Sequence, residues 1–130
     1  MKGKVDSVIK IPTTLDNFFR YWFEFLKPIH QLSRREIDVA SSLVKHRYLL
    51  SKAISDEALL DKMSLSTDVR KQIMQEHDLP PRYFNVVISN LKKNKVIVDG
   101  RINPKFIPRI KEDKGNFQLL LLYDFNDSFE

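Results

Sequence analysis

The chain has 130 residues, a net charge of +5 and a pI near 9.5, with 42% hydrophobic and 30% charged residues. This balance predicts one globular domain with a real core, and the positive charge favours an anionic partner. The absence of cysteine excludes a disulfide framework and a thiolate metal site. No apolar run reaches membrane-spanning length and no secretory signal opens the chain, so a cytoplasmic or intra-particle location is expected.

The first predicted elements are a short strand over residues 5–11 and a helix over residues 15–27, which Pro28 should end. The helix carries two aromatic stripes, one of Phe18, Trp22 and Phe25 and one of Phe19, Phe23 and Leu26. Two stripes exceed what one buried face needs, so the helix either lies deep in the core or is clamped between core and partner. The general burial of aromatic side chains favours the core. If a partner binds, we expect it at Phe19 and Phe23.

The next helix is predicted over residues 33–51, because Ser33 and Glu36 have the spacing of a capping box. Its inner face should hold Ile37, Ala40, Val44 and Tyr48. A short amphipathic helix follows over residues 56–63. We interpret its acids as ordinary solvated helix residues: Asp56, Glu57 and Asp61.

Two further helices are predicted over residues 67–76 and 81–94, with a turn at Asp78, a residue type that tolerates left-handed backbone. Pro81 suits the first position of the second of these helices. That helix has an apolar stripe of Phe84, Val87, Ile88 and Leu91. Its opposite side collects Arg82, Val86, Ser89 and Lys93, with Asn85 and Asn90 beside them.

The remaining elements are extended. Residues 96–98 predict a strand, and Asp99 with Gly100 predicts a hairpin turn. The two prolines in residues 102–108 should exclude helix and allow an edge strand or an extended loop. Residues 117–125 predict a strand that is apolar on both sides and therefore covered on both faces.

The run from Ile73 to Ile97 resembles the winged helix-turn-helix superfamily. The apolar spacing of the family is matched at Ile73, Leu79, Phe84, Val87, Ile88 and Leu91, followed by a basic, strand-forming exit. The chain departs from the family at His77, where an aliphatic residue is usual, and at Asp78, where glycine is common.

The resemblance implies a mainly α fold with a small β-sheet, namely a winged helix-turn-helix with an additional N-terminal aromatic helix. Residues 1–130 would form a single domain. Within it, residues 1–31 would be an N-terminal strand and helix extension, residues 32–110 the helical core and wing, and residues 111–130 a C-terminal strand.

Basic residues concentrate between Arg82 and Lys111, where eight lysines and arginines face one acid, Asp99. A solvated basic face would explain such a run, and so would double-stranded DNA. In the DNA interpretation, the residues that read base edges are Arg82, Asn85, Ser89, Asn90 and Lys93. The residues that hold phosphates are Lys92, Lys95, Arg101 and Lys105.

The function that the resemblance implies is control of transcription or replication, most often as a homodimer. A chain this small resembles the compact regulators of phages and mobile elements, so the host cytoplasm or the inside of a phage particle is the expected location. The alternative is a structural or adaptor protein that uses the winged-helix fold for protein–protein contacts in a larger assembly such as a virion.

An enzyme is not expected. His30, His46 and His77 lack metal-ligand spacing, the three glycines are isolated, and no serine sits in a nucleophile elbow. The sequence therefore predicts no catalytic residue, metal, cofactor or small-molecule substrate, and no membrane contact.

Overall fold

The computed structural model describes residues 12–110, which are mainly helical with one small antiparallel sheet. The elements in order are α1 (Leu15–Phe25), α2 (Lys27–His30), α3 (Arg34–Ser51), α4 (Glu57–Ser64), α5 (Thr67–Glu76), α6 (Pro81–Lys93), β1 (Ile97–Val98), β2 (Arg101–Ile102) and the 3-10 helix η1 (Pro104–Phe106). The strands expected over residues 5–11 and 117–125 lie outside the described residues. Across residues 12–110, no helix combines the length and apolar character needed to cross a membrane.

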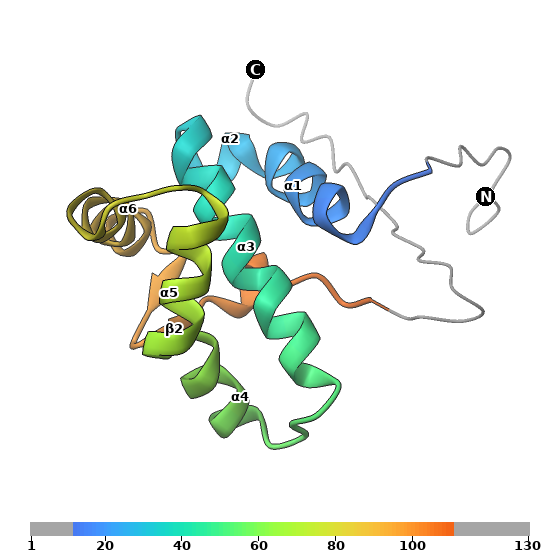
Figure 1. The fold of residues 1–130 in the computed structure, drawn as a ribbon. Helices are drawn as coiled ribbons and strands as arrows, with labels where there is room; N and C mark the ends of the chain where they lie inside the picture. The colour runs from blue at the N-terminus through green and yellow to red at the C-terminus, as the bar shows by residue number, and fades with distance from the viewer. Residues whose placement is uncertain (1–11, 111–130) are drawn as a thin grey trace, which may run out of the picture.

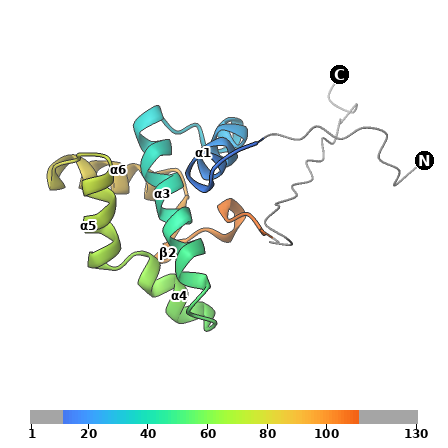
Figure 2. The ribbon, with the colours of Figure 1, turned by 45° about the vertical axis from the view of Figure 1, so that its right-hand side comes forward.

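Helix α3 occupies the middle of the fold (Figure 1). Both views place α1 on one side of it and α5 and α6 on the other, with α4 near its C-terminal end (Figure 2). One hydrophobic cluster joins these layers, with members from α1, α3, α5, α6, the hairpin and η1. Its largest fully buried side chains include Phe19, Phe23, Ile37, Leu43, Ile73, Phe84, Leu91 and Ile102.

The expected local signals at helix α3 and at the two turns are confirmed. The Ser33 Oγ accepts from the Glu36 backbone N–H, and the Glu36 carboxylate accepts from the Ser33 N–H at 2.9 Å, which completes the capping box. Asp78 has a left-handed φ of 51° between α5 and α6. The β1–β2 turn has φ values of 55° at Asp99 and 74° at Gly100, as a two-residue type I′ turn requires.

Two expectations about prolines need correction. Helix α1 ends at Phe25, and Pro28 lies in the first turn of a second helix, α2, where its missing N–H loses no hydrogen bond. The expectation that residues 102–108 exclude helix is wrong for Pro104–Phe106, which form η1. Pro104 opens that helix at a position with no required donor, and the Asn103 side chain accepts from the Lys105 N–H at 3.0 Å.

His30 of α2 is a buried polar link between α1 and the connection that leads into α3. Its Nδ1 accepts from the Leu32 N–H at 2.9 Å, so the neutral ring carries its proton on Nε2, which donates to the Phe23 carbonyl at 2.7 Å. Burial lowers the pKa of His30 below 6.5, and the nearby charge of Lys27 lowers it slightly further. The hydrogen bond to Phe23 and the charge of Glu24 raise it by smaller amounts. The fold therefore holds this ring in its neutral form.

Acidification is expected to destabilise the protein through His30. Below pH 6.5 the unfolded side chain binds a proton that the folded one resists, so the free energy of unfolding falls as the pH drops through the lowered folded pKa. Urea unfolding at about pH 7.5 and about pH 5.5 measures this loss, since the pH window straddles the ordinary histidine pKa. The His30→Asn variant cannot titrate and should lose less stability. An equal loss in both proteins would assign the effect to other groups, such as His77, whose pKa burial also lowers.

Candidate nucleic-acid interface

Helix α6 has one buried face and one polar, basic face. Phe84, Val87, Ile88 and Leu91 are buried, which confirms the inward stripe and fixes the rotation of the helix about its axis. The opposite side leaves four polar or basic side chains exposed along the whole helix: Arg82, Asn85, Ser89 and Lys93. The helix contains no acidic residue. Side chains of these types on one helix face can contact base edges in a DNA major groove, which is wide enough to admit an α-helix.

Two exposed side chains on α6 add apolar surface to this face. Val86 is 54% exposed and belongs to the outward side, and Tyr83 is 61% exposed on its flank. An apolar side chain at such a position can contact the methyl group of thymine. The sequence pattern places Val86 on the outward side but assigns no role to it. Tyr83 is not among the predicted site residues, although helical spacing alone puts it outside the buried stripe.

Asn90 does not belong to the outward face, and its assignment as a base-reading residue is wrong in this structure. Its side chain is half-buried, and its Nδ2 donates to the Glu36 carboxylate at 2.8 Å. Glu36 also completes the cap of α3, so this one carboxylate connects the start of α3 to α6. The hydrogen bond uses the amide group of Asn90 inside the protein and leaves Asn85 as the exposed asparagine of the helix.

The end of α6 directs two lysines outward. Lys92 is exposed in the last turn, where a cation also offsets the negative end of the helix. Lys95 follows with a left-handed φ of 66°, and the Val96 N–H donates to the Leu91 carbonyl at 2.9 Å, which closes the helix and starts the hairpin. Both lysines therefore lie where α6 meets the wing, which we define as Ile97–Ile102.

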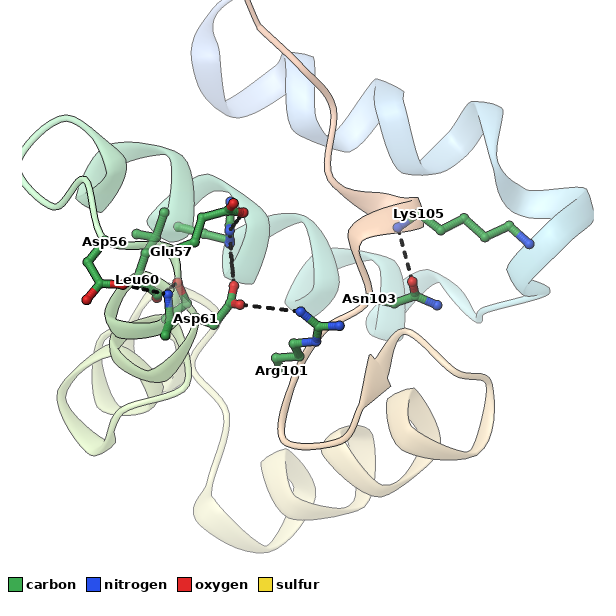
Figure 3. Close-up of polar contacts among 10 residues, drawn as sticks. Asp56, Glu57, Leu60, Asp61, Arg101, Asn103 and Lys105 are labelled. Atoms are coloured by element: carbon green, nitrogen blue, oxygen red, sulfur yellow. Dashed lines mark hydrogen bonds and ion pairs between the residues drawn. The ribbon is translucent and has the colours of Figure 1, made fainter.

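Arg101 of the wing faces α4. Its Nη1 lies 3.8 Å from Asp61 Oδ2, as Figure 3 shows. Asp61 is not the solvated acid that its sequence context suggests, because its Oδ1 accepts two hydrogen bonds from Arg47, at 3.2 and 3.0 Å. Only 12% of the Arg47 side chain and 16% of the Asp61 side chain are exposed, so this pair anchors α4 to α3 beneath the wing.

The structure does not bring every candidate phosphate contact together. Lys105 is exposed on η1, and its side chain extends away from Arg101, toward the side of the molecule that carries α1 (Figure 3). Lys92 lies in the last turn of α6, Lys95 in the connection to the wing, and Arg101 in the wing itself. These three residues form the compact part of the predicted phosphate-binding set.

The expectation of a partner interface at Phe19 and Phe23 is wrong. Both side chains are buried, at 1% and 0% exposure, because this stripe of α1 packs against α3 and the core. The apolar residues that α1 and α2 expose are Tyr21, Phe25 and Ile29, at 47%, 51% and 54%. The choice between stripes depends on which side of the helix meets α3, and the aromatic pattern alone does not encode it.

The histidines have structural partners in the described chain. His77 Nε2 lies 2.6 Å from Ser42 Oγ, and His46 Nε2 lies 2.8 Å from a Glu76 carboxylate oxygen. Between residues 12 and 110, no group of three or more histidine, aspartate or glutamate side chains is arranged to hold a metal ion.

Comparisons of the chain with protein-family models, with curated proteins and with solved structures find no match. The geometry and charge of α6 and of the wing therefore carry the assignment of function.

Proposed function

We propose that the chain binds double-stranded DNA as a winged helix-turn-helix regulator of transcription or replication. The observation that carries the proposal is the outward face of α6, where Arg82, Asn85, Ser89 and Lys93 are exposed opposite a buried apolar stripe. Helices α3, α5 and α6 followed by a hairpin have the element order of that fold, with α4 as an additional helix between the first two.

The proposed binding mode assigns a role to each part of the surface. Arg82 can pair with guanine through two hydrogen bonds and Asn85 can pair with adenine in the same way, so both residues read sequence. Lys92, Lys95 and Arg101 hold phosphates from the end of α6 and from the wing, which fixes register without reading bases. The absence of acids from α6 removes repulsion between this face and the DNA backbone.

Duplex DNA affinity should fall steeply with salt, and single substitutions should separate the two roles. Each phosphate contact contributes about 0.9 to the slope of log affinity against log salt, so Lys92→Ala should reduce the slope by about one unit for every sequence. Arg82→Ala should instead reduce the difference in affinity between duplexes of different sequence. Fluorescence anisotropy with labelled duplexes at several salt concentrations measures both quantities.

The matched control is Lys27→Ala, which removes one exposed positive charge from α2, on the α1 side of the fold. It should leave the salt slope unchanged. A wild-type chain without measurable duplex affinity at low salt would reject the DNA-binding function, and an equal effect of Lys27→Ala and Lys92→Ala would reject the assignment to α6.

A second candidate function is protein–protein contact, as a structural or adaptor protein that uses the same fold. It is favoured by the three large apolar side chains that α1 and α2 expose, Tyr21, Phe25 and Ile29. In this case Phe25→Ala should weaken self-association in analytical ultracentrifugation and leave the thermal stability unchanged. A wild-type chain that stays monomeric at every concentration would reject the homodimer form of this function.

A further inference from the structure

A hollow of about 650 Å³ lies between α4, the first turn of α5, the end of α6 and the β1–β2 turn. Its volume is within the range of pockets that hold ligands in proteins. Four cationic side chains from four different elements line it: Lys62, Arg70, Lys92 and Arg101. Lys62 and Arg70 lie outside the basic stretch of the sequence, and only the folded chain brings them beside Lys92 and Arg101.

Arg47 lies below the hollow and neutralises one of the acids that line it, Asp61. Asp61 accepts two hydrogen bonds from Arg47, and a Glu57 carboxylate oxygen lies 3.6 Å from the same guanidinium. Arg47 itself is mostly buried and does not line the hollow. Its charge offsets Asp61, while Glu57, whose side chain is 85% exposed, and Asp99 at the tip of the turn remain as acids of the rim. The four cations outnumber these two acids, so the rim keeps a net positive charge.

The four cations are available to a ligand. Within residues 12–110, Lys62 and Lys92 are exposed and form no ion pair. Arg70 donates from Nε to the Leu65 carbonyl at 3.0 Å, which fixes its guanidinium and leaves the two terminal nitrogens as donors. The Arg101 guanidinium lies 3.8 Å from Asp61, which is too long for a hydrogen bond. The ion pair therefore orients the guanidinium and leaves its N–H donors available.

We propose that this hollow binds a phosphate of the DNA backbone that runs beside α6, with Lys62 and Arg70 as further phosphate contacts. The inference rests on the proposed function and extends it from α6 and the wing to α4 and α5. Lys92 connects the two regions, because it belongs to the end of α6 and also lines the hollow. Arginine contributes paired donors that match phosphate geometry, and lysine contributes a mobile point charge.

The test measures the salt dependence of duplex affinity for Lys62→Ala and Arg70→Gln by fluorescence anisotropy. Each variant should reduce the slope of log affinity against log salt by about one unit, because one phosphate contact is lost. The loss of affinity should be equal for unrelated sequences, and Lys62→Glu should weaken binding more than Lys62→Ala. Arg70→Gln also loses the hydrogen bond to the Leu65 carbonyl. Thermal unfolding followed by circular dichroism shows whether this variant remains folded.

The matched control is Lys71→Ala, which removes an exposed charge next to Arg70 on the same helix and does not line the hollow. Its salt slope should equal that of the wild-type chain. If Lys92→Ala reduces the slope and Lys62→Ala and Arg70→Gln do not, the hollow is not a phosphate site and the DNA-binding function stands. If the wild-type chain does not bind duplex DNA, both proposals fail together.

A second arm separates backbone phosphate from free phosphate. Inorganic phosphate is titrated into the isotope-labelled chain while amide shifts around Lys62 and Gly100 are followed by NMR. We expect inorganic phosphate to compete with the duplex for the hollow in the wild-type chain. This competition should disappear in the Lys62→Ala variant. Phosphate binding that depends on Lys62 while duplex affinity does not would assign the hollow to a free phosphate compound and overturn the backbone proposal.

Discussion

Replacing Phe23 by alanine is expected to lower the free energy of unfolding by about 3–5 kcal/mol, the usual cost of truncating a buried phenylalanine. Phe23 has no exposed surface. Its ring stacks on Phe106 at 6.1 Å between centroids and lies 5.8 Å from the ring of His30. Alanine would leave a cavity where α1, α2 and η1 meet, beside the rings of Phe106 and His30.

Urea unfolding followed by circular dichroism measures this loss. The matched control is Phe25→Ala, which truncates the same side chain on the same helix where it is 51% exposed. Surface substitutions of this kind change stability by less than about 0.5 kcal/mol. An equal loss of unfolding free energy in the two variants would contradict the packing of α1 described above. The same holds if Phe23→Ala keeps the wild-type stability but no longer binds a partner.

Replacing Leu91 by alanine is expected to lower the free energy of unfolding by about 2–5 kcal/mol, the range for a core leucine. Leu91 has no exposed surface and belongs to the cluster that joins α6 to the rest of the core. It also lies in the last turn of α6, and its carbonyl accepts from the Val96 N–H at 2.9 Å, next to the hairpin. The cavity would therefore open at the base of the wing.

The control on the same helix is Val86→Ala, because Val86 is 54% exposed on the opposite side. Thermal unfolding of the two variants compares the inward and outward faces of α6 directly. A small loss for Leu91→Ala together with a large loss for Val86→Ala would mean that the helix is rotated about its axis. Arg82 and Asn85 would then no longer face outward, and the proposed DNA-binding surface would have to be abandoned.

Features set by neighbouring residues could be predicted from the sequence. The capping box depends only on Ser33 and on Glu36 three residues later. The hairpin turn depends only on two adjacent residues that tolerate positive φ, Asp99 and Gly100. The buried stripe of α6 follows from the helical period, because Phe84, Ile88 and Leu91 recur on one side. These local constraints set the order of the elements and the direction of the outward face of α6.

Contacts between distant residues could not be predicted in this way. Asn90 has the spacing of an outward residue, yet it donates to Glu36, 54 residues earlier in the chain. Asp61 has the context of a solvated acid, yet Arg47 on another helix covers it. The hollow beside the wing is lined by four elements that come together only when the core forms. The residue pattern of a single element therefore does not predict the hollow.

The indole of Trp22 connects the beginning and the end of the described chain. Its Nε1–H donates to the Phe106 carbonyl at 2.8 Å across 84 residues, from α1 to the helix that follows the wing. Trp22 is the single tryptophan of the chain, so its fluorescence comes from this one junction. Tryptophan fluorescence therefore reports on the contact between α1 and η1. Its emission should change when η1 separates from α1, and should stay the same when a ligand occupies only the distant surface of α6.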